Sequence, residues 1–147
     1  MAGPTSVLFA CTQNAIRSAM AEAILKHVAG SRIFVDSVGV RPDELDPFAV
    51  AVMKEIGIDL SRHRPKGFDD LEDDNFDLVI SLSPEAQHRA VEMTRTTACD
   101  LEFWNTYDPT AVEGNRETRL AAFRQVRDML LARIRERFDD RAQERAR

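Results

Sequence analysis

The residues best suited to chemistry lie near the amino terminus, where Cys11 follows an apolar run and Arg17 and Ser18 come shortly after it. A cysteine thiolate is a nucleophile, and the planar fork of an arginine matches two oxygens of a phosphoryl group. A serine hydroxyl can donate a hydrogen bond to the thiolate, which helps most when the thiolate must leave. These side chains together are suited to nucleophilic attack on a tetrahedral oxyanion.

Strand and helix patterns alternate around this loop. A strand is predicted over residues 5–10, because they are rich in β-forming residues and residues 7–10 are all apolar, as in a strand covered on both faces. Residues 19–28 carry apolar side chains at helical spacing. The alternation continues along the chain, with strands predicted at 32–38, 76–80 and 101–104 and helices at 46–57, 83–93 and 115–138. This order predicts an α/β fold with a parallel sheet, right-handed crossovers and helices on both faces.

The predicted fold places Cys11 where such sheets bind their ligands, at the carboxyl end of a strand. A loop that runs from a strand into a helix can direct several backbone N–H groups at one point, and the helix dipole adds to their field. We therefore expect an anion site that also stabilises a thiolate on Cys11. A buried structural cysteine with a solvated Arg17 is the alternative, because this spacing also occurs by chance.

Composition and charge limit the classes of molecule that the protein is expected to bind. The net charge is −5 and the pI is near 5.2, which argues against nucleic acids and anionic membranes as partners. No apolar run near the amino terminus is long enough for a signal peptide or a membrane span, so we expect a cytoplasmic protein. Cys11 and Cys99 cannot form a disulfide framework, and no histidine clusters with either cysteine. Neither a metal nor an organic cofactor is predicted, and the oligomeric state is left open.

Two Asp-Pro pairs offer a candidate acid. Asp46 fits a helix N-cap with proline at the first helical position, because a helical pattern begins at once. No apolar period follows Asp108 until Leu120, so we interpret Asp108 as a loop carboxylate rather than a simple cap. Such a carboxylate can protonate a leaving oxygen and then accept a proton from an attacking water.

The stretch VLFACTQNAIRSAMAEA resembles the signature of the low-molecular-weight protein tyrosine phosphatase family, which also contains thioredoxin-coupled arsenate reductases. Further matches follow in order: Ser37-Val38-Gly39, Asp46-Pro47, EIGIDLSRHRPK, FDLVISL and Asp108-Pro109. The resemblance extends to about Phe138. We accordingly predict a single domain over residues 1–147 with a four-stranded parallel sheet in the order 2-1-3-4. Its charged tail, from about residue 140, is expected to fray.

The resemblance implies a role for each site residue. Cys11 would be the nucleophile, Arg17 the phosphoryl-binding arginine and Asp108 the general acid. Ser18 would donate to the thiolate, and Asn14 would hold the loop in shape with help from Ser37. The residues implied to contact the substrate are Thr12, Gln13, Asn14, Ala15, Ile16, Arg17 and Ser18.

The chain also departs from the family pattern. Gln13 stands where the family has glycine, so a side chain enters the loop, where it could strain the backbone or reach across the mouth. Ile16 replaces a second loop cysteine. The segment between Gly39 and Asp46 is short, as in the reductases, and lacks the aromatic residue that flanks the pocket of many family phosphatases. Thr110-Ala111 follows the Asp-Pro pair where eukaryotic members carry tandem tyrosines.

Residues outside the loop are given structural roles. Trp104 and Tyr107 are predicted to pack beside the loop, with Tyr107 at the pocket rim. His63, between Arg62 and Arg64, is interpreted as part of a solvated turn, with a structural hydrogen bond as the alternative.

The leading functional prediction is hydrolysis of phosphotyrosine or another small phosphomonoester through a cysteinyl-phosphate intermediate. Arsenate reduction is the first alternative. It would need an external thiol, because SLSPEAQH, after the third predicted strand, holds no cysteine and Cys99 is expected to be buried. The second alternative is a non-catalytic phosphate-binding module in which Gln13 has abolished turnover.

Overall fold

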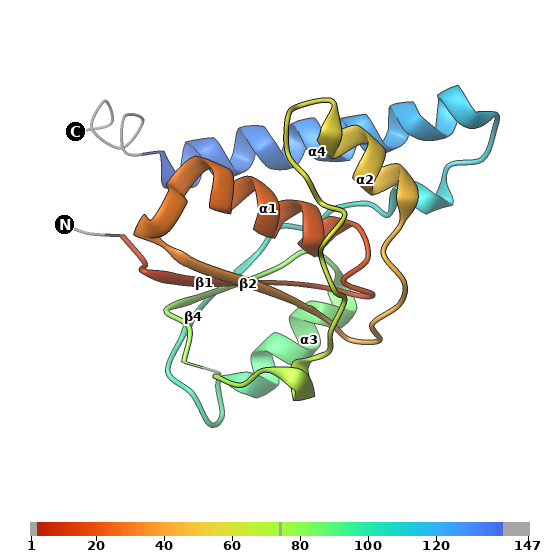
Figure 1. The fold of residues 1–147 in the computed structure, drawn as a ribbon. Helices are drawn as coiled ribbons and strands as arrows, with labels where there is room; N and C mark the ends of the chain where they lie inside the picture. The colour runs from red at the N-terminus through yellow and green to blue at the C-terminus, as the bar shows by residue number, and fades with distance from the viewer. Residues whose placement is uncertain (1–2, 74, 140–147) are drawn as a thin grey trace.

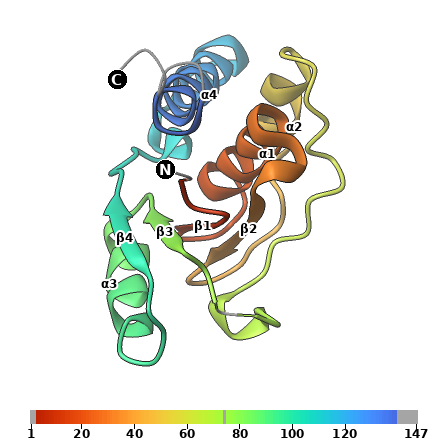
Figure 2. The ribbon, with the colours of Figure 1, turned by 90° about the vertical axis from the view of Figure 1, so that its left-hand side faces the viewer.

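Four parallel strands form the centre of the described structure, and their order is β2-β1-β3-β4 (Figures 1 and 2). The computed structural model describes residues 3–73 and 75–139, so the tail predicted from residue 140 lies outside the described residues. The strands are β1 (Ser6–Cys11), β2 (Phe34–Gly39), β3 (Leu78–Ser81) and β4 (Asp100–Phe103). The predicted parallel sheet and its strand order are confirmed.

Helices cover both faces of this sheet, as predicted. The helices are α1 (Arg17–Ala29), α2 (Pro47–Lys54), α3 (Pro84–Met93) and α4 (Arg116–Phe138). Figure 1 shows α1, α2 and α4 on one side of the sheet and α3 on the other. Within residues 3–73 and 75–139, three short 3-10 helices lie at Gly30–Arg32, Phe68–Asp70 and Pro109–Ala111. Among the described residues, no helix is long and apolar enough to cross a bilayer.

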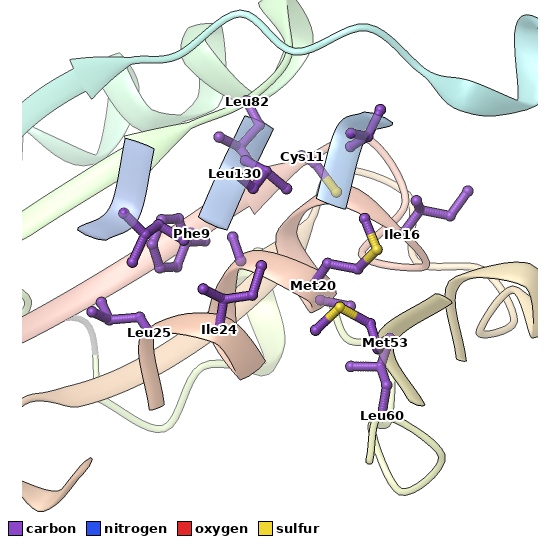
Figure 3. Close-up of a cluster of buried hydrophobic side chains, with 14 of the residues drawn as sticks. Phe9, Cys11, Ile16, Met20, Ile24, Leu25, Met53, Leu60, Leu82 and Leu130 are labelled. Atoms are coloured by element: carbon purple, nitrogen blue, oxygen red, sulfur yellow. The ribbon is translucent and has the colours of Figure 1, made fainter. Parts of the chain in front are cut away.

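Strand β1 contributes to both layers of the core, which explains its uninterrupted apolar sequence. Val7, Phe9 and Cys11 belong to the cluster beneath α1 and α4, whereas Leu8 and Ala10 face the cluster beneath α3. Figure 3 shows Phe9 and Cys11 near Leu130 of α4, with the Cys11 sulfur near Met20 and Ile16. The nucleophile candidate therefore lies on a strand whose residues 7–11 are all buried.

Helix α1 begins earlier than the apolar pattern predicts. Arg17 and Ser18 form its first turn, and both side chains are buried although they are polar. The spacing of apolar residues cannot detect such a start, because Arg17 and Ser18 are polar residues that are buried at the functional site and not in the hydrophobic core. Helix α2 ends at Lys54 rather than at Gly57, and a turn follows in which Gly57 has a φ of 78°. The N-cap predicted for Asp46 is confirmed, since its carboxylate accepts the Phe48 N–H at 2.8 Å.

Candidate active site

The backbone carbonyl groups of the loop between β1 and α1 accept hydrogen bonds from N–H groups of the segment that follows β2. The bonds run from Val40 N to Cys11 O (3.1 Å), Arg41 N to Thr12 O (2.8 Å), Asp43 N to Gln13 O (3.1 Å) and Asp46 N to Ala15 O (3.2 Å). Within residues 3–73 and 75–139, no acceptor pairs with the N–H groups of Gln13, Ala15 or Ile16. Since the carbonyls point outward, these donors are left for a bound anion.

Cys11 lies at the base of this loop with donors on its sulfur. Its side chain is 2% exposed, and the Sγ atom accepts the Asn14 N–H at 3.2 Å. Ser18 Oγ lies 2.8 Å from Sγ and itself accepts a hydrogen bond from Asn14 Nδ2 at 2.8 Å. The Ser18 proton is therefore free to point at the sulfur or at the Val38 carbonyl 3.3 Å away, and the contact with sulfur is shorter. Both donors stabilise a thiolate.

Arg17 is a buried cation at the same loop. It is 9% exposed, and its Nη1 donates to the Thr106 carbonyl at 2.9 Å. In the described part of the chain, no carboxylate lies within ion-pair distance of it. A buried guanidinium without an anion is costly, and the remaining N–H donors of its fork are available. The site is thus built to receive a negatively charged group.

Asp108 completes a small cavity above Cys11. The cavity is small, about 10 Å³, and its lining residues are Cys11, Gln13, Ala15, Ile16, Arg17 and Asp108. The Asp108 Oδ1 atom accepts from Thr110 N (2.9 Å) and Thr110 Oγ1 (2.7 Å), which caps the 3-10 helix Pro109–Ala111. The interpretation of Asp108 as a loop carboxylate rather than a cap is therefore only half right. A three-residue turn is too short to produce an apolar period.

The predicted contact residues divide into two groups. Gln13, Ala15, Ile16 and Arg17 line the cavity. The other side chains, those of Thr12, Asn14 and Ser18, point elsewhere: Thr12 Oγ1 donates to Ser83 Oγ at 3.1 Å, whereas Asn14 and Ser18 bond to each other and to groups behind the loop. These three residues can serve a bound anion through the loop's shape and backbone.

Asn14 is the centre of a buried hydrogen-bond network behind the loop. Its φ is 55°, in the left-handed region that asparagine tolerates better than most residues. Its Nδ2 donates to Ser37 Oγ at 2.8 Å as well as to Ser18, and its Oδ1 accepts the Lys66 N–H at 3.1 Å. Ser37 therefore lies where the prediction placed it, against Asn14.

His63 joins the same network, so its assignment to a solvated turn is wrong and the structural hydrogen bond is correct. The His63 side chain is 10% exposed, and its Nε2 lies 3.1 Å from both the backbone and the side-chain oxygen of Asn14. Its Nδ1 lies 3.8 Å from a Glu22 oxygen, and Ser37 Oγ donates to the same oxygen. Burial lowers the pKa of His63, and the Glu22 carboxylate opposes this shift.

Glu22 and Gly39 are two site residues that the sequence prediction missed. Glu22 is 9% exposed, and an acidic residue on the inner face of a helix was the available signal. A Cβ on Gly39 would lie 2.6 Å from Gln13 C and 2.6 Å from Asn14 N, so only glycine lets β2 approach the loop. The sequence indicated Gly39 as part of a family match and as one end of a short segment, but not as a position where a side chain would collide with the loop.

Trp104 and Tyr107 pack near the site without lining its cavity. Trp104 is buried with its ring edge against Phe9. The Tyr107 hydroxyl donates to the Ala122 carbonyl at 3.2 Å and lies 2.7 Å from Gln125 Oε1, so its polar end is held by α4. Neither residue is among those lining the cavity.

Cys99 lies at the opposite end of the sheet. It precedes β4, whose first residue, Asp100, is level with Leu78 of β3 and therefore with Val7 of β1. Because strands rise about 3.3 Å per residue, Cys99 and Cys11 are separated by roughly 13 Å or more along the strand direction. The two thiols cannot pair without rearrangement of the sheet. Burial raises the pKa of Cys99, which is only partly buried.

The described residues contain no group of three or more His, Cys, Asp or Glu side chains placed to hold a metal ion. The ionisable groups that converge on the cavity are Cys11, Arg17 and Asp108. This set is suited to covalent attack on an oxyanion, with a cation to bind it and a carboxyl group to handle protons.

Comparison with known proteins agrees with this geometry. The family model for low molecular weight phosphotyrosine protein phosphatase matches residues 6–146. An arsenate reductase of Bacillus subtilis (strain 168) is 36% identical over 130 residues, which cover 88% of this chain and 92% of the relative.

Solved structures of both reductases and phosphatases share the fold. An arsenate reductase in its oxidized state superimposes with a TM-score of 0.75 at 30% identity, covering 90% of this chain and 95% of the other. The YwlE arginine phosphatase from Geobacillus stearothermophilus gives a TM-score of 0.73 at 25% identity, covering 97% and 95%. The chain therefore belongs to the low molecular weight phosphotyrosine protein phosphatase family of enzymes.

Proposed function

We propose that the protein is an arsenate reductase that uses Cys11 and an external thiol. The observation that carries this proposal is the small cavity over Cys11, which has a buried, unpaired Arg17 in its wall and no aromatic side chain among its described lining residues. At about 10 Å³ it is far smaller than the sites that hold drug-sized ligands, roughly 300–1,000 Å³. It suits a small inorganic oxyanion. The relatives and solved structures named arsenate reductase, at 36% and 30% identity, support the same reaction.

The chemistry begins with an exchange at arsenic. The Cys11 thiolate attacks arsenic(V), an S–As bond forms, and one oxygen leaves as water after taking a proton from Asp108. The unpaired N–H groups of the loop and the fork of Arg17 hold the other three oxygens. Ser18 and Asn14 N–H stabilise the sulfur before attack and again when it leaves.

Reduction follows from outside the protein. A thiolate of the co-substrate attacks the Cys11 sulfur, an S–S bond forms, and the S–As electron pair stays on arsenic, which departs as arsenite. A second thiol then attacks the mixed disulfide, releasing the Cys11 thiolate and an oxidised co-substrate. Two thiols thus supply two electrons. They must come from another molecule, because Cys99, the other thiol of the chain, lies at the far end of the sheet.

Phosphomonoester hydrolysis is the second candidate, favoured by that same separation of the two thiols. It requires no reductant: Cys11 attacks phosphorus, Asp108 protonates the leaving alcohol, and Asp108 then accepts a proton from the water that hydrolyses the phosphocysteine. The sequence alone favoured this reaction, and the relatives favour reduction. Both reactions use Cys11, Arg17 and Asp108 in the same roles up to the covalent intermediate.

The deciding experiment compares both reactions on one preparation. Arsenite release would be measured with arsenate and either glutathione plus glutaredoxin or reduced thioredoxin. Para-nitrophenyl phosphate hydrolysis would be measured in parallel, and Cys11→Ser is the control for both. Thiol-dependent arsenite release that disappears in Cys11→Ser supports the proposal. Hydrolysis with no arsenite above the control would replace it with the phosphatase, and phosphate binding without either reaction would indicate the binding module.

A further inference from the structure

Gln13 lines the cavity, and its backbone is held in place from behind. Its carbonyl accepts the Asp43 N–H at 3.1 Å. On the other side, the Gln13 backbone packs against Gly39, in the space that a Cβ on Gly39 would fill. A methyl group there would lie 3.0 Å from the Gln13 Cα atom. With its backbone fixed from both directions, Gln13 contributes to the cavity lining together with Cys11 and Asp108.

The side-chain amide of Gln13 is not used in the folding contacts of the described structure. Among residues 3–73 and 75–139, no group forms a hydrogen bond with this amide, and the residue is exposed. A primary amide brings two N–H donors and one acceptor. Asp108, which lines the same cavity, uses Oδ1 to cap its 3-10 helix, and no described residue bonds to its Oδ2. Two uncommitted polar groups therefore border the same small space.

The direction of attack identifies what these groups would meet. In an in-line displacement the leaving oxygen lies opposite the attacking sulfur, here on the Asp108 side of the cavity. In inorganic arsenate or phosphate this oxygen is unsubstituted and can accept a hydrogen bond. In a monoester the same oxygen carries the organic group, which must pass through the mouth that Gln13 borders.

We propose that Gln13 is a specificity-determining residue that favours an unsubstituted tetrahedral oxyanion over its monoesters. Its amide N–H donates to the outer oxygen of the inorganic ion, and its side chain occupies space that an ester substituent needs. This inference rests on the proposed oxyanion site at Cys11, and it explains why a side chain is present where a glycine would suffice for the loop.

The surroundings of the mouth agree with this selection. An aryl ester gains most of its binding from apolar and aromatic walls. Tyr107, the aromatic residue beside Asp108, is tied to α4 through its hydroxyl group and does not line the cavity. Ala15 and Ile16 supply the apolar part of the lining, and both are buried.

The test measures binding rather than turnover. Alkylation of Cys11 by iodoacetamide would be followed by mass spectrometry, which separates Cys11 from Cys99. Protection by inorganic phosphate and by phenylphosphonate, a non-hydrolysable aryl analogue, gives a dissociation constant for each. The proteins compared are wild type, Gln13→Gly, which removes both the amide and the bulk, and Gln13→Leu, which removes the amide and keeps the bulk.

We expect Gln13→Gly to shift the ratio of the two dissociation constants toward phenylphosphonate by about tenfold, or about 1.4 kcal/mol. Gln13→Leu should weaken phosphate several-fold without improving phenylphosphonate. A ratio in Gln13→Gly within twofold of wild type would overturn the proposal, and so would a loss of protection by both ligands, which would make Gln13 a support for the loop. Failure of phosphate to protect the wild-type protein would instead contradict the proposed function itself.

Discussion

The two ends of the sheet carry the same nucleophilic side chain in different surroundings. Cys11 closes β1 at the carboxyl end, where an N–H and a hydroxyl group approach its sulfur and a buried arginine lies in the same cavity. Cys99 precedes β4 at the amino end, where burial raises its pKa against the opposing hydrogen bond from Thr97. Burial alone disfavours a thiolate, whereas burial among directed donors can stabilise one.

This contrast shows why the carboxyl end of the sheet carries the chemistry. Where a strand leads into a helix, free N–H groups lie at the carboxyl end of the strand. Three such connections, β1 to α1, β2 to α2 and β3 to α3, lie at this end of the sheet, together with the loop that follows β4. At the amino end, the described residues bring a hydrogen bond from Thr97 to the Cys99 sulfur but no comparable set of donors. The amino end instead exposes apolar surface, with Phe34 57% exposed and stacked on Phe76.

The largest effect is expected from exchanging the two thiols for hydroxyl groups. Cys11→Ser should lower turnover by roughly 10³-fold or more, because serine is a far weaker nucleophile at neutral pH. Cys99→Ser should leave turnover within about twofold, since no step uses it. Steady-state rates of both variants test this directly. Comparable losses in the two variants would show that Cys99 takes part in the reaction.

The close approach of β2 to the loop offers the next test. Gly39→Ala introduces a Cβ that would lie 2.6 Å from loop backbone atoms, so the loop or the strand must shift. We expect a loss of about 1–3 kcal/mol in the free energy of unfolding and weaker phosphate binding. Gly67→Ala is the matched control, because its nearest neighbours lie at ordinary contact distances of 3.5 Å or more. Urea denaturation and phosphate titration separate the two variants, and equal behaviour would refute the packing argument.

The network behind the loop should make stability depend on pH. Because burial lowers the pKa of His63 from its usual 6.5, the folded protein binds a proton there less readily than the unfolded chain. The contribution of His63 is therefore fully present above pH 6.5 and is lost as the pH falls through the lower, folded-state pKa.

Substitution of this histidine tests the pH dependence. His63→Gln, which retains an N–H donor toward Asn14, should lose part of the drop in unfolding free energy between pH 7.5 and pH 5 and cost about 1 kcal/mol at pH 7.5. Urea midpoints of both proteins at the two pH values provide the measurement. Parallel profiles would mean that another group causes the dependence.

The smallest effect is expected at the amino end. Phe34→Ala removes an exposed ring that stacks on Phe76 at a centroid distance of 5.9 Å. We expect the unfolding free energy to fall by about 1 kcal/mol or less, with unchanged kcat/KM. Thermal unfolding and a rate assay are sufficient, and a large loss of activity would contradict the separation of the two ends.

Local sequence patterns were sufficient to predict the elements and the parallel sheet, whereas the strand order was predicted from the family resemblance. The uninterrupted apolar run of β1, the alternation of strands and helices and the Asp46 cap all depend on neighbouring residues, so they could be read along the chain. The position of Cys11 at the end of the first strand followed from the same pattern. Helix starts were less certain, as α1 shows, because Arg17 and Ser18 are buried for reasons other than hydrophobicity.

The composition of the site was decided by contacts that span much of the chain. The Arg17 fork is held by the carbonyl of Thr106, and Asn14 receives His63 and Lys66 from a segment that reads as polar and charged. Asp108 reaches the cavity from a short turn with no periodic pattern.

The sequence by itself determined which elements form and that a cysteine ends the first strand, because periodicity and capping act between near neighbours. Only the tertiary structure decided that His63 and Glu22 support the loop and that Gly39 must lack a side chain. The physical reason is that these contacts form only once the sheet brings its carboxyl ends together, and no short-range pattern encodes that meeting.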